Sequence, residues 1–308
     1  MRLDEWAKSD PPVTSVSDFP LPLFRAGKVR DVFDLGDRLL IIATDRLSAF
    51  DVVLPTPIPG KGRLLTAISD FWFDRTAELM PNHRTGASIE TLGLDPQQLA
   101  HLHGRSSIVR KAERIGIECV VRGHLAGSGW KEYQAMRTLA GEPLPVGLSR
   151  GAELPEPRFT PAIKNDSGHD ENISRTDLAD RVGAELASRL GRASIGLFQR
   201  AREVAAGAGF VLADTKFEFG FIDGQLTLID EALTPDSSRY WDVVTWDSGS
   251  EPPGFDKQVV RDWLESSGWD KEPPGPTLPR HIVETTRQRY AEVLDRLMRF
   301  HEMTEEGP

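Results

Sequence analysis

The chain has 308 residues, of which 39% are hydrophobic and 27% are charged, and its formal net charge is −10. This is the composition of an ordinary globular protein, and domains of about 100–200 residues make two of them the natural expectation. The negative charge argues against a nucleic-acid or anionic-membrane partner, whereas a small anionic ligand needs only a local basic pocket.

The N-terminus MRLDEWAKSDPPV lacks the apolar stretch of a signal peptide, and no apolar run approaches the roughly 20 residues that cross a bilayer. We therefore expect a cytoplasmic protein.

The first third of the chain is rich in predicted strands. Strand patterns cover 29–35 and 38–44, joined at Gly36-Asp37, and 106–111 and 116–122. Between the two pairs, an apolar stripe from Leu65 to Leu79 predicts a helix. We place a domain boundary in the connection AERI, which gives domains 1–112 and 113–308.

The central part of the chain contains the single cysteine and then a long polar stretch. One cysteine excludes an internal disulfide and a cysteine-rich zinc site, and Cys119 in the apolar run IECVV is expected to be a buried, inert thiol. The segment HLAGSGWKEYQAM predicts a glycine-rich turn that enters a helix with Ser128 as its N-cap. We expect an irregular loop over 141–174, and loops of this length inside a compact domain are usually functional or disordered.

Two alanine-rich helices are predicted over 175–190 and 193–208, and an amphipathic helix near 280–300. Between them lies the segment LADTKFEFGFIDGQLTLIDEALTPDSSRYW, which has the alternation of a β-hairpin. Its first strand places aromatic residues on one side and three charged residues, Asp214, Lys216 and Glu218, on the other.

The register of this hairpin decides where Asp230 lies. A two-residue turn at Asp223-Gly224 puts Asp230 on the aromatic side, where a charge is costly. A three-residue loop over 222–224 instead puts it opposite Lys216 and diagonal to Glu218, where the two carboxylates can share a Mg²⁺ ion that also binds phosphate. We therefore expect the three-residue loop; a solvated strand face with paired charges is the alternative.

Two further segments are candidates for anion binding. In AGKVRDVF, Gly27 permits a tight turn, and Lys28 and Arg30 then alternate along a strand, although GKGR further on is not a Walker A loop. In VVRGHLAGSG, Arg122 ends a strand and Ser128 opens a helix whose free N–H groups attract phosphate. The polar segment AIKNDSGHD contains four more candidate site residues, Lys164, Asp166, His169 and Asp170. His124 in VVRGHLAGSG is a fifth.

Six segments in order across residues 27–241 resemble one family. GKVRD, TDRLSAFD, ECVVRGHLAGSGWKEYQ, TPAIKNDSGHDENIS, DTKFEFG and IDEALTPDSSRYW are similar to the phosphoribosylaminoimidazole-succinocarboxamide synthases, or SAICAR synthetases, of purine biosynthesis. The resemblance implies an ATP-dependent ligase that joins carboxyaminoimidazole ribonucleotide (CAIR) to L-aspartate. It also implies an α/β (α+β) fold of two lobes, a mainly antiparallel N-terminal lobe and a larger C-terminal lobe, with ATP in the cleft as in kinase and ATP-grasp sites.

The resemblance also implies roles for individual residues. Nucleotide contacts would come from Lys28 and Arg30 over the phosphates, from the connector Arg110, Lys111 and Ala112 at adenine, and from Lys164. Glu218 and Asp230 match the Mg²⁺ ligands. CAIR would be held at its 5′-phosphate by Arg122, Ser128 and Arg239, and at its ring and ribose by Asp170 and Asp214. Catalytic groups would be Lys164, Asp214 and Lys216, while Asp45, Ser48 and Asp51 of TDRLSAFD would line the cleft.

Other functions remain open at this point. A small-molecule kinase could use the same Mg–ATP site, although GHDEN is not the HRDxxxxN loop of protein kinases. A nucleotide-binding regulator without turnover would not need both metal carboxylates and a separate phosphate site. The expected partners are therefore the small molecules ATP, CAIR and L-aspartate, with no nucleic acid and no membrane, in a monomer or a small homo-oligomer.

Overall fold

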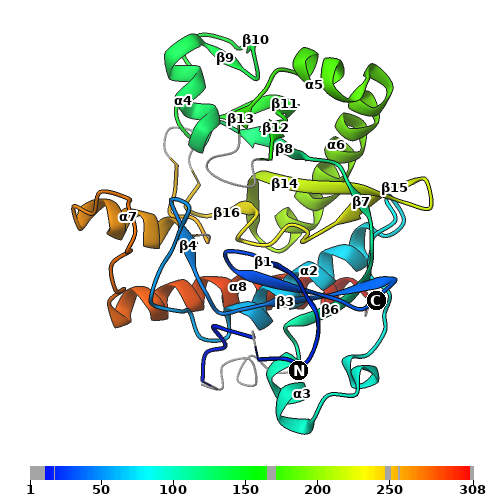
Figure 1. Ribbon diagram of the computed structural model, residues 1–308. Coiled ribbons are helices and arrows are strands. Elements are labelled where there is room, and N and C mark those ends of the chain that lie inside the picture. Colours follow the sequence, from blue (N-terminus) through cyan, green and yellow to red (C-terminus); the bar gives the residue numbers. More distant parts are fainter. Residues whose placement is uncertain (1–10, 17, 165–170, 247–250, 256, 306–308) are drawn as a thin grey trace. The chain divides into compact units, whose positions relative to one another are not determined.

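The computed structural model describes residues 11–16, 18–164, 171–246, 251–255 and 257–305 (Figure 1). The chain forms two compact units. Unit 1 comprises Met1–Phe71, His83–Ala112 and Phe255–Asp295, and unit 2 comprises Trp72–Asn82, Glu113–Gly254 and Arg296–Pro308. The expected division into domains 1–112 and 113–308 stays a prediction, and 255–295 group with unit 1.

Unit 1 is built on a four-stranded antiparallel sheet. Its order is β1-β2-β3-β6, with β1 Leu23–Ala26, β2 Arg30–Asp34, β3 Arg38–Ala43 and β6 Ser106–Arg110. One face packs Phe33, Leu40 and Ile108 into a core that the 3₁₀-helix Ile89–Leu92 and helix α3, Pro96–Leu102, help to cover. The strands predicted over 29–35, 38–44 and 106–111 are confirmed to within a residue or two.

A second core in unit 1 joins segments far apart in the sequence. The short hairpin of β4, Ser48–Ala49, and β5, Val52–Val53, packs with helix α7, Gln258–Ser266, and the first turn of helix α8, Arg280–Glu305. Its fully buried side chains include Leu47, Ile58 and Val260. Helix α2, Lys61–Thr76, confirms the helix predicted from Leu65 onward but ends three residues before Leu79. Helix α8 confirms the amphipathic helix expected near 280–300.

Unit 2 contains an eight-stranded sheet centred on β8, Ile117–His124, and β14, Phe210–Ile222 (Figure 1). The order is β13-β12-β8-β14-β15, and β11 also pairs with β8 while β16 and β7 pair with β14. The other strands of this sheet are β7 Glu113–Arg114, β11 Glu153–Phe159, β12 Ala162–Ile163, β13 Glu171–Asn172, β15 Gln225–Ile229 and β16 Ser238–Asp242. The irregular loop expected over 141–174 is therefore wrong in part, because β11 adds a seven-residue strand to β8.

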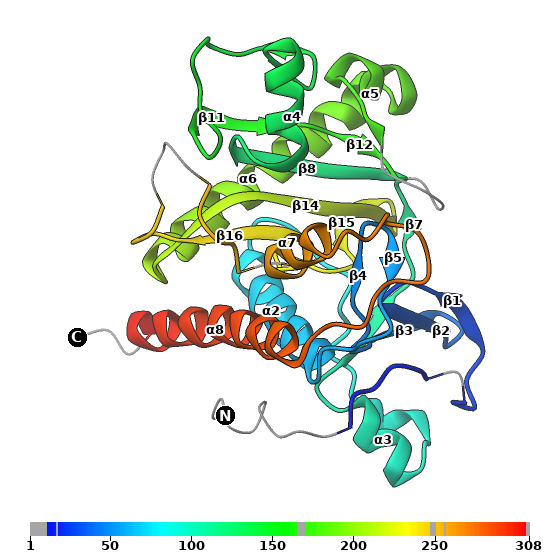
Figure 2. The ribbon, with the colours of Figure 1, turned by 90° about the vertical axis from the view of Figure 1, so that its left-hand side faces the viewer.

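Helices α5, Arg175–Val182, and α6, Ala184–Gly207, follow, and α6 packs on one face of this sheet (Figure 2). The predicted helix break after 190 is wrong. The helices part at Gly183, whose φ of +85° leaves the helical region, whereas Gly191 stays inside α6 against the ring of Phe159. Remaining elements of unit 2 are α4 Gly127–Met136 and the ribbon of β9 Thr138–Leu139 and β10 Glu142–Pro143. Within the described residues, no helix is long and apolar enough to span a membrane.

Candidate active site

The two faces of the unit 2 sheet differ in chemistry. On the face toward α6, Phe217 and Phe219 are fully buried, and Cys119 hydrogen-bonds Ser194 of that helix. Burial raises the pKa of the Cys119 thiol, which confirms the expected buried, inert cysteine. The opposite face carries seven charged side chains, which we call the charged face: Glu118, Arg122, Lys164, Asp214, Lys216, Glu218 and Arg239.

Strand register explains why these side chains meet. Asp214 pairs with Arg122 of β8 on one side and with Arg239 of β16 on the other. Because side chains alternate along a strand, Lys216 and Glu218 follow on the same face of β14. Glu118 lies four residues before Arg122 and therefore joins them.

Arg122 is the centre of the first cluster. Its guanidinium donates from Nε to Thr160 Oγ1 (3.1 Å), from Nη1 to Asp214 Oδ2 (3.2 Å) and from Nη2 to Ser128 Oγ (2.8 Å). Burial lowers the pKa of Arg122; the Asp214 carboxylate opposes this shift and Arg239 adds to it. Since Arg122 is only 5% exposed, its charge needs the compensation that Asp214 supplies.

Asp214 bridges two arginines, because Arg239 Nη1 also donates to its Oδ2 atom. Glu251 lies near the far side of Arg239, with 3.9 Å between Oε1 and Nε. Two guanidinium groups held this way, beside the start of helix α4, present N–H donors that are suited to a phosphate group.

The glycines of HLAGSGW make this approach possible. A Cβ at Gly127 would lie 2.3 Å from Arg239 Nη2, and one at Gly129 would lie 3.1 Å from Arg122 Cδ. The expected N-cap is wrong: Ala126 occupies the N-cap position of α4, with no side-chain cap hydrogen bond, and Ser128 stands in the first turn. Its hydroxyl accepts from Arg122 instead of capping the helix.

The second cluster consists of two buried carboxylates and two lysines. Lys216 Nζ donates to Glu118 Oε1 (2.8 Å), and Lys164 Nζ donates to Glu218 Oε1 and lies 3.9 Å from Glu118 Oε1. Glu118 and Glu218 are 4% and 8% exposed. Like charges on neighbouring strands repel each other, so the two ammonium groups stabilise this arrangement.

The hairpin that carries Asp230 has a different register from the one expected. Ile222 pairs with Gln225, so Asp223 and Gly224 form a two-residue turn in which both φ angles are positive, +51° and +74°. Glu218 pairs with Ile229, which would direct the next side chain toward the aromatic face. However, the strand ends at Ile229 and Asp230 has a φ of +70°, so the alternation of the strand does not extend to Asp230. The predicted three-residue loop, with Asp230 opposite Lys216, is therefore wrong.

In unit 1, the predicted phosphate-binding turn is ordered by its neighbours. Gly27 N donates to Arg30 O (2.8 Å), Lys28 forms an ion pair with Asp51, and Arg46 Nε donates to Lys28 O (3.0 Å). The carboxylate of Asp45 is fully buried and accepts hydrogen bonds from both Nη atoms of Arg105. Ser48 lies in β4.

The connector expected at adenine follows β6. The backbone of Arg110 donates to His83 O (2.8 Å), and the ammonium of Lys111 contacts both carboxylate oxygens of Asp34 at 2.8 and 2.9 Å. That hydrogen bond holds the pKa of Asp34 below its usual range. Ala112 is the last residue of this segment of unit 1, and unit 2 continues from Glu113.

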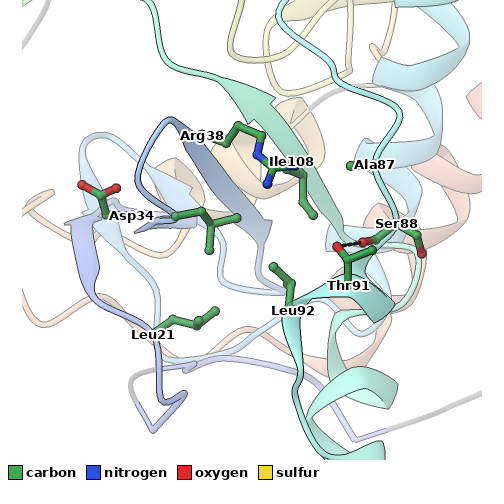
Figure 3. Close-up of a pocket in the computed structure, with 9 residues that line it drawn as sticks. Leu21, Asp34, Arg38, Ala87, Ser88, Thr91, Leu92 and Ile108 are labelled. Atoms are coloured by element: carbon green, nitrogen blue, oxygen red, sulfur yellow. Dashed lines mark hydrogen bonds between the residues drawn. The ribbon is translucent and has the colours of Figure 1, made fainter.

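A pocket of about 560 Å³ lies in unit 1, and the Asp34 that contacts Lys111 is part of its lining (Figure 3). Leu21, Leu35, Leu92 and Ile108 line it with apolar surface, and Asp34, Arg38, Ser88 and Thr91 supply polar groups. Because its lining contains none of the predicted site residues, we do not assign it to the reaction.

The remaining candidates are three residues of the segment AIKNDSGHD and His124. Asp166, His169 and Asp170 lie outside the described residues. His124 is buried between Trp241 and Trp246, each at 5.2 Å between ring centroids, and burial lowers its pKa to about 4, so it is neutral at pH 7. Among the described residues, no three His, Cys, Asp or Glu side chains gather as a metal-binding group.

Comparisons with known proteins agree with this geometry. The family model described as SAICAR synthetase matches residues 23–276. The chain belongs to the SAICAR synthetase family. A phosphoribosylaminoimidazole-succinocarboxamide synthase of Methylobacillus flagellatus is 52% identical over 280 residues, 90% of this chain and 94% of that protein. The SAICAR synthase of Saccharomyces cerevisiae, solved with SAICAR, has a TM-score of 0.84 at 38% identity and covers 92% of this chain and 97% of its own. A SAICAR synthetase solved with ADP has a TM-score of 0.65 at 25% identity, with 88% and 97% covered.

The protein is therefore an ATP-dependent ligase of purine biosynthesis that joins CAIR to L-aspartate, as the sequence resemblance implied. The expected mixed fold with antiparallel sheets is confirmed, while the cleft between lobes stays a prediction. Two residues of the site were missed. Glu118 could have been found from its period-two spacing to Arg122, whereas Thr160 gave no signal because its partner depends on β11 turning back along β8.

Proposed function

We propose that CAIR binds along the charged face of unit 2, with its 5′-phosphate at the arginine cluster and its carboxylate near the lysines. The observation that carries this proposal is the alternation of Asp214, Lys216 and Glu218 on β14. Four residues of strand span about 13 Å, so the two clusters suit a ligand with a phosphate at one end and a reacting carboxylate at the other.

At the phosphate end, Arg122 and Arg239 supply the charge, and Ser128 and the first turn of α4 supply further donors. Asp214 keeps the two guanidinium groups together and can accept hydrogen bonds from the ribose. Asp170 would contribute at the ring.

At the other end, Glu218 and Asp230 would hold Mg²⁺. Two carboxylates are the usual protein share of a magnesium site, since phosphate oxygens and water complete it, and the donors here fit that chemistry. Bound Mg²⁺ would neutralise charge on the phosphoryl oxygens. Lys164 and Lys216 add positive charge from the protein itself, and Lys164, which pairs with Glu218, is available for the nucleotide once that carboxylate binds the metal.

In unit 1, Lys28 and Arg30 would contact the ATP phosphates, and Arg110, Lys111 and Ala112 would contact adenine. Ser48 would contribute to the substrate site.

The reaction would proceed in two steps. A CAIR carboxylate oxygen attacks the γ-phosphorus of ATP, the bond to ADP breaks, and an acyl phosphate forms. The amine of aspartate then attacks the acyl carbon, phosphate leaves with the bonding pair, and the amine loses a proton. No enzyme nucleophile is needed, so the residues act by position and charge. We expect this to occur in the cytoplasm.

The test is an ADP-release assay coupled to a dehydrogenase, with CAIR and aspartate omitted in turn. The proposal requires both substrates for full turnover, and a burst of one ADP per enzyme with CAIR alone would support the acyl phosphate. Steady ADP release without aspartate would instead indicate a kinase, and no release with both substrates would contradict the ligase.

A further inference from the structure

The turn between β4 and β5 has an unusual backbone. Ser48 pairs with Val53 and Ala49 with Val52, so Phe50 and Asp51 form a two-residue turn, with φ of +51° and +64°. Such turns favour Asn-Gly, because both positions must be left-handed. A phenylalanine in this region is rare, and strain of this kind persists only where the surroundings hold it.

The C-terminal part of unit 1 supplies those surroundings. The Phe50 ring lies 6.5 Å from that of Trp269, and Lys271 Nζ lies 4.2 Å from the Phe50 centroid, within cation–π range. These two partners are themselves held: Trp269 Nε1 donates to Glu272 O (2.8 Å), and Lys271 pairs with Glu265 (3.3 Å).

On its other side, the turn holds the predicted phosphate-binding lysine. Asp51 forms an ion pair with Lys28. The side chain of Lys28 is 47% exposed and that of Asp51 is 38% exposed. Arg46, from the same TDRLSAFD segment, donates to Gly27 O (2.9 Å) and binds both carboxylate oxygens of Asp31. The backbone and the ammonium of Lys28 are thus fixed by one segment.

We propose that Phe50, Trp269 and Lys271 are positioning residues for nucleotide binding, which act on Lys28 through Asp51. They fix the strained turn, and the turn then restricts the Lys28 side chain before nucleotide arrives. The Lys28 ammonium has three N–H donors, so it can keep its contact with Asp51 while it donates to a phosphate oxygen. This inference rests on the proposed contact of Lys28 with the ATP phosphates.

The experiment measures the Kd of Mg–ADP for the full chain by calorimetry. Asp51→Asn keeps a residue that tolerates a left-handed backbone, and it should raise the Kd by up to about tenfold, because Lys28 regains its rotamer freedom. Lys271→Met removes the cation and keeps the aliphatic chain, and it should raise the Kd about two- to fivefold. The matched control is Arg289→Met, which removes another cation–π contact of unit 1, 4.8 Å from Phe255, and should leave the Kd unchanged.

A double variant separates positioning from general destabilisation. If Lys271 acts through Asp51, Asp51→Asn with Lys271→Met binds Mg–ADP no more weakly than Asp51→Asn alone. Additive losses, or an unchanged Kd in Lys271→Met, would overturn the inference. The proposed function fails differently: Lys28→Met with an unchanged Kd would remove Lys28 from the nucleotide site, whatever the other variants do.

Discussion

Replacing Asp214 by Asn tests whether one carboxylate holds the arginine cluster together. Asn keeps the size and one acceptor, but Arg122 and Arg239 lose the charge between them. Both members of the Arg122–Asp214 pair are nearly buried, at 5% and 6% exposure. Removing one partner of a buried ion pair lowers the free energy of unfolding by about 3–5 kcal/mol. Because the Asn oxygen can still accept one hydrogen bond from an arginine, we expect a loss at the low end, about 3 kcal/mol.

Thermal unfolding is the assay. At roughly 2–4 °C per kcal/mol for a unit of this size, Tm should fall by about 6–12 °C. Asp242→Asn is the matched control, because Asp242 pairs with Arg296 in the same unit but the two side chains are 25% and 22% exposed. Such a pair is worth less than about 1 kcal/mol, so Tm should fall by only a few degrees.

Added phosphate provides the second part of the test. A dianion between the two guanidinium groups replaces the missing charge, so inorganic phosphate should raise Tm more in Asp214→Asn than in the unaltered protein. Equal losses in the Asp214 and Asp242 variants, or the same phosphate response as the unaltered protein, would refute the bridging role of Asp214.

Three further changes test other parts of the site. Arg122→Ala should raise the KM for CAIR about ten- to hundredfold and leave that for ATP nearly unchanged in steady-state kinetics; equal changes would show that Arg122 serves no separate phosphate site. Asp230→Asn tolerates the left-handed backbone but loses the charge for Mg²⁺, so kcat should collapse and residual activity should need more Mg²⁺; a lower Tm with normal Mg²⁺ dependence would make Asp230 structural. Burial lowers the pKa of His124 to about 4 in the folded protein, whereas its ordinary value in the unfolded chain is about 6.5. As the pH falls from about 6.5 to about 4, the unfolded chain binds a proton that the folded protein does not, so the free energy of unfolding falls by roughly 3 kcal/mol. His124→Phe should flatten that part of the pH–Tm curve, and an unchanged curve would assign the loss to other groups.

The sequence predicted those features that depend on local periodicity. Alternation along β14 was enough to separate the charged face from the aromatic one, and the strands around Gly36 and the helix α8 followed from the same kind of pattern. The groups of side chains that meet across neighbouring strands were predicted only through the resemblance, because partners such as Arg122 and Asp214 are 92 residues apart in the sequence.

The errors have a common physical origin in single backbone conformations. Asp230 has a positive φ and follows the end of β15, so the strict alternation from which the three-residue loop was predicted does not extend to it. Gly183 and Gly191 are equally able to break a helix, and the residue type does not tell which one does: Gly183 has a φ of +85°, whereas Gly191 lies inside α6. The packing of Trp269 on Phe50 joins residues more than 200 positions apart, beyond the reach of any periodic pattern.

The discontinuous core of unit 1 has a consequence for the way the chain leaves the ribosome. Leu47, Leu54 and Ile58 are covered in the finished protein by Val260 and Leu264, which are synthesised about 200 residues later. At about 5–20 residues per second, these apolar side chains wait roughly 10–40 s for their partners. Until then these side chains lack the surface that covers them in the finished protein, and the turn at Phe50 and Asp51 gains its contacts with Trp269 and Lys271 only near the end of synthesis.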